Sequence, residues 1–386
     1  MLFSEERQIH TTREIAQQPR MWKETFLLFK EKQNELEEFF NEIISKHDQL
    51  RVIFTGAGTS AYIGNILLPH FRNNDRVIID SIATTKIVSN PYNYLTNQAT
   101  LLVSFARSGD SPESIATTEL AEQCIESVYH LVISCNEVGS LAKNSVGKCN
   151  RFVFLLPPET NDKGFAMTSS FTSMMLAGLL IFEWLLNKHK ISSDFMNQYC
   201  TMADEFLRKN EETIKKIAKS DFKRVVNLGS GVFEGLAQEA SLKILELTGG
   251  LIQVCSNSPL GFRHGPKSFL DHDTITFVYI SSHPYTRMYD VDILKEIYRE
   301  EKRKEIIAIV SGEVSKEITV HCDHCFIIPN LDTADVYLSL LYILTAQTLA
   351  VYKSSFLGLN PDNPFADGRV NRVVQGVTIY PYIDEI

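Results

Sequence analysis

Short runs of hydrophobic residues recur along the chain, and each run ends in a polar or glycine-rich turn. Four runs in the first half are rich in Val, Ile, Leu and Phe, at 51–58, 100–111, 128–137 and 151–160. A continuous apolar run of this length, separated from the next by helical spacing, is typical of a strand in a parallel sheet with both faces covered. The pattern therefore predicts an α/β domain in this half.

The second half repeats these signals in the same order. The segment RVIFTGAG at 51–58 returns as RVVNLGSG at 224–231. Three further strands and a closing apolar helix follow, at 274–285, 305–313, 325–333 and 335–353, the helix matching the one near 166–187. An offset of about 173 residues indicates a duplicated doubly wound domain.

The first 48 residues lie outside this repeat. Thr11 and Glu14 have the spacing of a capping box, and residues 34–44 are amphipathic, so we expect a helical extension packed on the first domain. The predicted domains are an N-terminal helical extension at 1–48, a first parallel-sheet domain at 49–217 and a second at 218–386.

Two loops of the first domain have the residues of a phosphate site. Thr55–Ser60 (TGAGTS) and Ala106–Ser111 (ARSGDS) each follow a predicted strand and lead into a helix. Glycines let backbone amides approach an anion, and hydroxyls and helix N-termini add donors. The same residues also suit ordinary turns and helix caps. Neither loop has the lysine of a P-loop, which excludes that type of nucleotide site.

A dinucleotide site is the main alternative. Gly56, Gly58 and Ala61 fit a relaxed dinucleotide fingerprint, and Asp80 ends the next strand near the place of a ribose-binding acid. The hydroxyl-rich second loop disfavours this alternative, because a nicotinamide pocket is expected to be more apolar. Fluorescence enhancement of NADH would reveal such a site.

Acid–base residues gather in the second half. Glu239, Lys243 and Glu246 are spaced so that they share one face of a predicted helix. A solvated row of ion pairs would have the same spacing. Downstream, His264 lies in a loop rich in glycine and proline. Such a histidine is either structural or functional.

Composition narrows the class of partner. The formal net charge of −9 at pH 7 argues against nucleic acid, which requires a basic surface. The first residues have no basic or apolar region of a signal peptide, so a cytoplasmic protein is expected. The apolar stretch 165–186 contains five hydroxyl residues and Glu183, which favours a core or dimer helix over a membrane span.

The seven cysteines are expected to be free thiols in a reducing compartment. Cys322 and Cys325 form a single CxxC with two histidines beside it. One such pair is a weak metal signal, and the first half has only one cysteine at the matching strand, so structural thiols are favoured. We predict no metal and no cofactor.

Several motifs resemble a known family. GAGTSAYIG, SFARSGDSPES and the run from LGSG through EASLKILEL to FRHGP are similar to the SIS (sugar isomerase) domains, which have a flavodoxin-like fold. The resemblance covers nearly the whole chain after residue 48. AMTSSFTSMMLAG, FRHGPKSFL and VNRVVQGVTIYP look more narrowly like the AgaS proteins, described as tagatose-6-phosphate ketose/aldose isomerases or galactosamine-6-phosphate deaminases.

The resemblance implies roles for individual residues. It places Glu246 as the base that moves the C1/C2 proton, Lys243 near the sugar, and His264 as the group that opens the ring, typically from the other subunit of a dimer. The expected substrate-binding residues are Gly58, Thr59, Ser60, Arg107, Ser108, Gly109, Ser111, Ala166 and Gln375.

Two departures separate this chain from the glucosamine-6-phosphate synthase pattern. Ala106 and Arg107 replace serine and glutamine, and Gln375 replaces a lysine near the C-terminus. We expect a phosphosugar deaminase that converts galactosamine 6-phosphate to tagatose 6-phosphate and ammonia, with plain aldose–ketose isomerisation as the closest alternative and a non-catalytic sugar-phosphate regulator as another. A homodimer or homotetramer, with no nucleic-acid or membrane partner, is the expected assembly.

Overall fold

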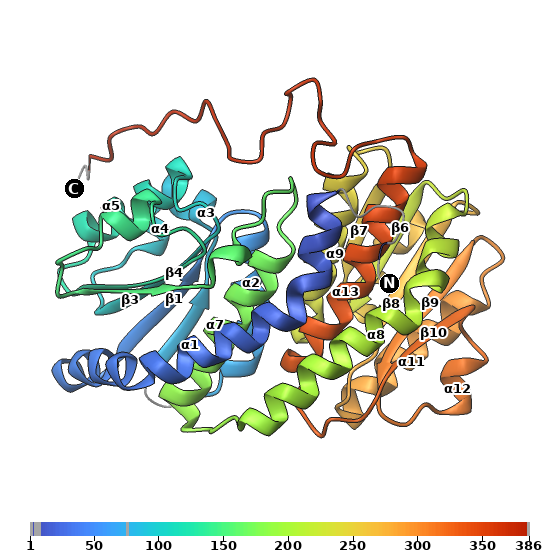
Figure 1. Ribbon diagram of the computed structural model, residues 1–386, viewed down its shortest axis with the longest axis horizontal. Coiled ribbons are helices and arrows are strands. Elements are labelled where there is room, and N and C mark those ends of the chain that lie inside the picture. Colours follow the sequence, from blue (N-terminus) through green and yellow to red (C-terminus); the bar gives the residue numbers. More distant parts are fainter. Residues whose placement is uncertain (1–2, 4–8, 75–76, 384–386) are drawn as a thin grey trace. The chain divides into compact units, whose positions relative to one another are not determined.

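The computed structural model describes residues 3, 9–74 and 77–383, and the chain divides into two compact units, each built around one sheet (Figure 1). The first-sheet unit comprises Arg20–Asp162, Ser169–Ser192 and Asp367–Ile386. The second-sheet unit comprises Met1–Pro19, Lys163–Thr168 and Ser193–Ala366. These units are discontinuous in sequence and so differ from the contiguous domains expected at 49–217 and 218–386.

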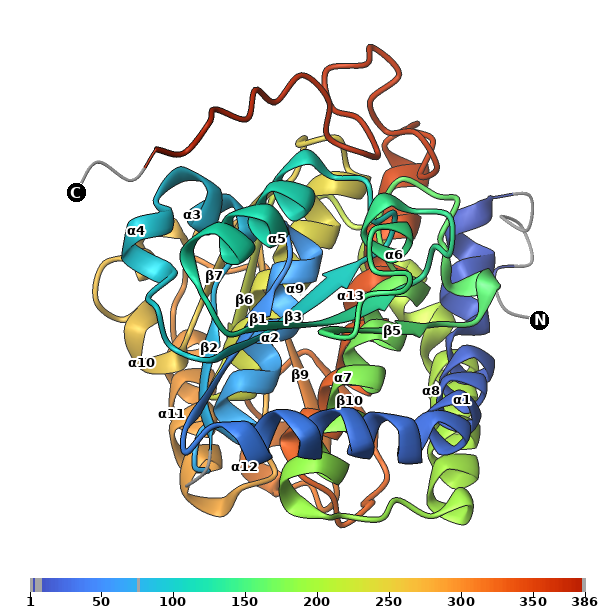
Figure 2. The same ribbon diagram turned by 90° about the vertical axis from the view of Figure 1, so that its left-hand side faces the viewer.

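The first sheet has five parallel strands in the order β2-β1-β3-β4-β5. Its strands are β1 (Leu50–Thr55), β2 (Val77–Ser81), β3 (Thr100–Ala106), β4 (Val128–Ser134) and β5 (Arg151–Leu155). The helices of this unit are α2 (Thr59–Phe71), α3 (Thr84–Ser89), α4 (Pro91–Tyr94), α5 (Pro112–Cys124), α6 (Ser140–Lys143) and α7 (Ser169–Asn187), with a 3-10 turn, η1, at Pro158–Thr160. Figure 2 shows α3 and α5 on one side of this sheet and α2 and α7 on the other.

The second sheet repeats this topology, with the order β10-β9-β8-β6-β7 and all strands parallel. Its strands are β6 (Arg224–Gly229), β7 (Gln253–Asn257), β8 (Thr274–Tyr279), β9 (Glu305–Ser311) and β10 (His324–Ile328). Its helices are α8 (Ser193–Lys219), α9 (Val232–Leu247), α10 (Pro259–Phe262), α11 (Pro284–Tyr298), α12 (Lys316–Thr319) and α13 (Asp335–Phe356), with a 3-10 turn, η2, at Pro266–Phe269. The predicted fold, two doubly wound parallel-sheet domains, is therefore confirmed.

One strand of the second sheet was not predicted from the hydrophobic pattern. The sequence of β7 is QVCSN, and none of its five residues is fully buried. As an edge strand it is covered less completely than the central strands, so it lacks the apolar run that reveals them.

The N-terminal helix α1 (His10–Lys46) departs from its prediction in two ways. Its residues up to Pro19 belong to the second-sheet unit, so the extension does not pack on the first domain alone. Thr11 lies within the helix and does not cap it. The carboxylate of Asp362 instead accepts hydrogen bonds from the amides of His10 (2.7 Å) and Thr11 (2.8 Å). The predicted capping box is therefore wrong, because Asp362, which is distant in the sequence, supplies the acceptor for the first amides of the helix.

The two long apolar helices form the cores of their units. By length and composition α7 and α13 are both able to cross a membrane, but 89% and 94% of their most apolar windows are buried inside the protein. In the first-sheet unit, the indole of Trp22 on α1 donates to the hydroxyl of Thr172 on α7 (2.9 Å). The hydroxyl residues of the stretch 165–186 are thus consistent with a core helix.

The cysteines of the CxxC pack as small core residues. Cys322 and Cys325 lie against a hydrophobic cluster that includes Ile306, Ala308 and Ile318. All seven cysteines are free. Among the described residues there is no group of three or more His, Cys, Asp or Glu side chains arranged to hold a metal ion.

Candidate active site

The two predicted phosphate loops meet at one edge of the first sheet. Strands β1 and β3 are hydrogen-bonded neighbours in parallel register, with Thr55 opposite Ser104. The loops that follow them, 56–58 and 107–111, therefore leave the same edge side by side. Helices α2 and α5 then run back along opposite faces of the sheet (Figure 2). This divergence is the topological switch point at which doubly wound sheets bind ligands.

The first loop presents a helix N-terminus to this crevice. Gly58 precedes α2 with φ of 55° and ψ of −125°, a conformation that side chains rarely adopt. It makes the turn that starts α2 at Thr59. The Thr59 and Ser60 side chains are buried, and the first-turn amides of the helix lie beside them. Amides at a helix N-terminus favour an anion.

The second loop is held in place by the segment that follows β4. Asn136 donates its side-chain amide to the carbonyl of Ser108 (2.7 Å), and the amide of Leu141 donates to the carbonyl of Gly109 (3.1 Å). The carboxylate of Asp110 accepts from the amide and hydroxyl of Ser140, at 2.9 and 2.8 Å. The only acid of the loop is thus tied to the start of α6.

The hydroxyl of Ser111 makes no cap hydrogen bond to α5, although Ser111 is the residue that precedes the helix. Pro112 occupies the first helical position, and the amides of the next two residues, which a capping side chain would reach, donate no hydrogen bond to the hydroxyl of Ser111. Ser111 therefore keeps its hydroxyl for another acceptor, as a phosphate ligand requires.

The acid–base residues of α9 form a buried cluster. Lys243 and Glu239 have fully buried side chains, and their ammonium nitrogen and carboxylate oxygen are 3.6 Å apart. The same ammonium contacts Glu246 at 2.5 Å, and the Glu246 side chain is 26% exposed. A solvated row of surface ion pairs is therefore excluded. The arrangement is a buried lysine between two carboxylates, of which only Glu246 reaches solvent.

His264 lies on a loop that α11 holds at both ends. Arg263 contacts Glu296 (2.6 Å) and Asp292 (2.7 Å), and Lys267 also contacts Glu296 (2.5 Å). Partial burial by itself would lower the pKa of both basic groups, but hydrogen bonds and opposite charge from Glu296 and its neighbouring acids outweigh it and raise both pKa values. His264 between them is exposed, and its imidazole has no polar contact within the described part of the chain. The sequence alone gave no signal for these contacts.

Comparisons with known proteins show the family of the chain. The SIS domain family matches residues 44–183. D-galactosamine-6-phosphate deaminase AgaS of Escherichia coli O157:H7 is 41% identical over 374 residues, which cover 96% of each chain. The chain belongs to the AgaS family. The corresponding protein of Shewanella sp. strain ANA-3 is 42% identical, over 97% of this chain and 92% of the relative.

A solved structure has the same fold over its whole length. The crystal structure of tagatose-6-phosphate ketose/aldose isomerase from Escherichia coli superposes with a TM-score of 0.90 at 37% identity, covering 99% of both chains. The family relationship therefore extends through both sheets and through the N- and C-terminal segments.

In this AgaS-family chain, Asp80, the acid of the dinucleotide alternative, takes part in an ion pair. The carboxylate of Asp80 accepts a hydrogen bond from the guanidinium of Arg51 at 2.7 Å. Arg51 also donates to the carbonyl of Tyr94 at 2.6 Å. One oxygen of the Asp80 carboxylate is thus used in a structural ion pair at the strand.

Arg107 holds the C-terminal segment over the loops. Its guanidinium is buried and donates to the carbonyl of Arg372 at 2.8 Å. Arg372 in turn donates to the carbonyl of Asp162, and the side chain of Gln123 donates to the carbonyl of Tyr382 (2.9 Å). Figure 1 shows this segment passing above α3 and α5. Gln375 lies between these anchors and is exposed.

Ala166 is the predicted binding residue that the first-sheet unit does not contain. It lies in Lys163–Thr168, a segment of the second-sheet unit, and is fully buried. The segment is fixed by Glu14, whose carboxylate accepts from the amides of Lys163 (2.5 Å) and Gly164 (3.2 Å). Glu14, expected to cap α1, instead positions this loop.

Proposed function

We propose that this AgaS-family chain is a D-galactosamine-6-phosphate deaminase, which forms D-tagatose 6-phosphate and ammonia in the cytoplasm. The observation that carries the proposal is the cluster on α9. Glu246 combines partial solvent access with a contact to the buried ammonium of Lys243, as a proton-transferring carboxylate requires. The names of relatives that match 96% of the chain support the same substrate class.

The phosphate is expected to bind at the loops with Gly58, Thr59, Ser60, Ser108, Gly109 and Ser111. Converging amides, hydroxyls and helix N-termini supply the donors for a dianion. Arg107 contributes by holding the C-terminal segment in place, and Gln375 and Ala166 are expected to face the sugar.

The reaction requires one proton shuttle and one water. His264 transfers a proton to the ring oxygen and opens the sugar. Glu246 takes the C2 proton to give an enolamine and returns it to C1, which leaves a 2-imino ketose. Water adds to C2, ammonia leaves, and the ketose remains, so one water is consumed for each ammonia released. Lys243 stabilises the negative charge that develops in the transition state.

Plain aldose–ketose isomerisation is the second candidate, because the Escherichia coli structure with the same fold has the name of a ketose/aldose isomerase. A substrate with a 2-hydroxyl in place of the amine would pass through the same proton shuttle without losing ammonia. Incubation with a panel of hexosamine and hexose 6-phosphates, with ammonia and ketose measured in parallel, separates the two. Enzyme dialysed against EDTA is expected to keep its activity.

Glu246→Gln tests the mechanism directly. The amide preserves shape but cannot accept the proton, so turnover should fall by about 10²–10⁴-fold, and exchange of the C2 proton with deuterium should be lost by NMR. Glu234→Gln, an exposed residue at the other end of α9, is the matched control. Exchange at the wild-type rate in Glu246→Gln would place the base elsewhere, with Glu239 as the next residue to replace.

A further inference from the structure

The duplicated sheet has a second pair of loops in the position of the phosphate loops. After β6, Gly231 adopts φ of 60° and ψ of −122°, nearly the values of Gly58. After β8, the residues 280–283 lead into α11, which begins at Pro284 as α5 begins at Pro112. Strands β6 and β8 are neighbours, so these two loops also meet at a switch point.

In this second pair, a carboxylate from a later helix accepts hydrogen bonds from the loop after β8. Asp335, in the first turn of α13, accepts from the hydroxyl of Ser281 (2.5 Å) and from the amide (2.8 Å) and hydroxyl (2.6 Å) of Ser282. Three donors on one carboxylate is the pattern by which a protein holds an anionic oxygen group.

A second carboxylate joins the two loops. Asp290 on α11 is buried, and it accepts from the hydroxyl of Ser230 in the β6 loop (2.6 Å) and from the amide of Ser281 in the β8 loop (2.9 Å). Burial first, and then the neighbouring charge of Asp335, raise the pKa of Asp290 to about 6.

The first sheet has no such acids at the equivalent places. Thr118 lies on α5, in the second turn as Asp290 lies on α11, and its hydroxyl donates to the carbonyl of Ile115. Helix α7 begins with Ser169 where α13 begins with Asp335. Asp110 is the one acid of the first pair of loops, and it is tied to Ser140.

We propose that Asp335 and Asp290 act as a built-in anion that closes the second pair of loops, so that each chain binds a single phosphate, at the first sheet. Of the two duplicated loop pairs, the first is therefore a binding site. The second has a structural role, because its hydrogen bonds connect α11 and α13 to the loops. The inference that each chain binds a single phosphosugar rests on the proposed function. The inference that the second pair of loops is closed does not.

Equilibrium dialysis with labelled inorganic phosphate tests this. Wild-type protein should bind one phosphate per chain, and Ser108→Ala/Ser111→Ala should lower its affinity at least tenfold without revealing a second site. Asp335→Ala should bind a second phosphate. Asp194→Ala, which removes an exposed acid from the first turn of α8, is the matched control and should bind one.

Two phosphates per wild-type chain, or a folded Asp335→Ala protein that still binds one, would overturn the proposal. If Asp335→Ala does not fold, Ser230→Ala and Ser282→Ala in the otherwise wild-type protein decide the question. Unchanged phosphate binding supports closure, and loss of a bound phosphate contradicts it. A chain that binds one phosphate but releases no ammonia from any hexosamine phosphate would refute the proposed function and leave this inference standing.

Discussion

Lys243 is the residue on which the acid–base cluster of α9 depends. Its ammonium is fully buried and lies 3.6 Å from Glu239 and 2.5 Å from Glu246. Because a buried charge is tolerated only when it is paired, each member of this cluster makes the others possible. The cluster therefore has a structural role, in holding Glu239 inside the protein, and we expect a chemical role at Glu246.

The two roles can be separated by substitution. Lys243→Met removes the buried ammonium beside the carboxylates of Glu239 and Glu246, which should cost about 3–5 kcal/mol of unfolding free energy and lower turnover about 10²-fold. The double variant Lys243→Met/Glu239→Gln should regain most of the stability but not the turnover. Urea unfolding and ammonia release measure the two effects. Lys32→Met, which breaks an exposed pair with Glu35, is the control and should change stability little.

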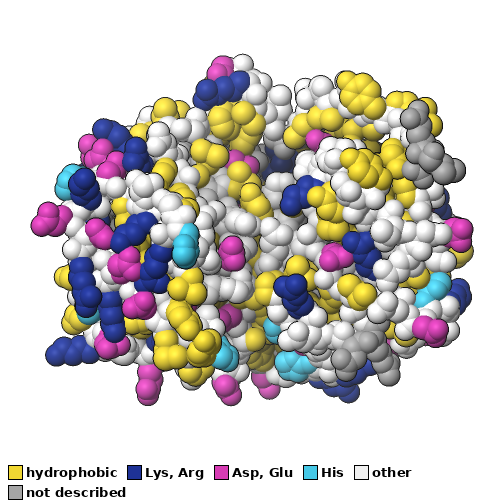
Figure 3. Space-filling model, turned by 180° about the vertical axis from the view of Figure 1, so that it is seen from behind, with side chains coloured by type: hydrophobic (Ala, Val, Ile, Leu, Met, Phe, Trp, Pro, Cys, Tyr) yellow, Lys and Arg dark blue, Asp and Glu magenta, His cyan; other side chains and the backbone are white. Residues whose placement is uncertain are grey.

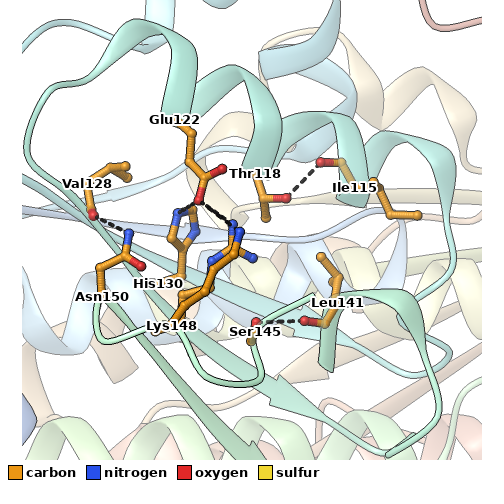
Figure 4. A network of polar contacts seen from close by, with 10 residues as sticks. Ile115, Thr118, Glu122, Val128, His130, Leu141, Ser145, Lys148 and Asn150 are labelled. Carbon is orange, nitrogen blue, oxygen red and sulfur yellow. Dashed lines mark hydrogen bonds and ion pairs between the residues drawn. The ribbon is translucent and has the colours of Figure 1, made fainter. Parts of the chain in front are cut away.

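His130 is a second residue whose environment controls its charge. It lies on β4 with a fully buried side chain, and its ring is 3.7 Å from the carboxylate of Glu122. Figure 4 shows Glu122 between His130 and the basic side chain of Lys148, and Arg151 also contacts this carboxylate. Burial first, and then the charge of Arg151, lower the pKa of His130 to about 4 from 6.5.

This pKa predicts a loss of stability in acid. Between pH 6.5 and about 4, the unfolded chain binds a proton at His130 that the folded chain refuses, so the free energy of unfolding falls as the pH falls, by up to about 3 kcal/mol. His130→Leu should remove this part of the acid dependence. Urea titrations at several pH values measure it, with the exposed His272→Leu as control. Equal pH profiles for wild type and His130→Leu would show that His130 does not contribute.

At the scale of elements, the loop from α10 to η2 is positioned by α11. Glu296 joins the two basic residues on either side of His264, and Arg263 and Lys267 contact different oxygens of its carboxylate. Gly265 follows His264 with φ of 118°, which side chains rarely adopt. The conformation of the loop is therefore fixed by one glycine and one acid, neither of which is expected to touch the sugar.

Glu296→Ala should misplace His264 without removing it. A small displacement of a catalytic group costs up to about 10²-fold in rate, so turnover on the closed sugar should fall while turnover of an open-chain analogue changes little. Glu301→Ala, an exposed acid just beyond α11, is the control. If both substrates lose rate equally, Glu296 acts through the stability of the fold and not through His264.

At the scale of the whole molecule, the features that concern possible partners are the distribution of surface charge and the assembly of chains. On the face shown in Figure 3, Lys and Arg side chains alternate with Asp and Glu, and hydrophobic side chains are scattered among them. The apolar helices α7 and α13 are core helices, so the expectation of an assembly rests on His264.

We expect His264 to act in the site of another subunit, because its imidazole is exposed and makes no polar contact with the described residues. Mixing His264→Ala chains with Glu246→Gln chains should then restore about a quarter of the wild-type activity in a random dimer, since half of the assemblies contain one intact site. Co-refolding followed by ammonia assay measures this. A fully active protein that is monomeric by light scattering would contradict it.

The sequence by itself determined the fold and the types of residue at the site. Parallel strands that are buried on both faces must be apolar, so most strands of both sheets could be found from their runs of Val, Ile and Leu. The glycine turns after β1 and β6 were visible for a similar reason, because Gly58 and Gly231 adopt a backbone conformation that favours glycine. Helical spacing was also enough to place Glu239, Lys243 and Glu246 on one face.

Only the tertiary structure decided how these residues are used. Whether the α9 row faces solvent or the interior depends on what covers it, and spacing does not contain that information. The acid that caps α1 is Asp362, more than 350 positions away, and the acid that closes the second pair of loops comes from α13. A hydrogen bond needs only a short distance in space, so its partners can be far apart in the chain, whereas a periodic pattern reports only on neighbours along it.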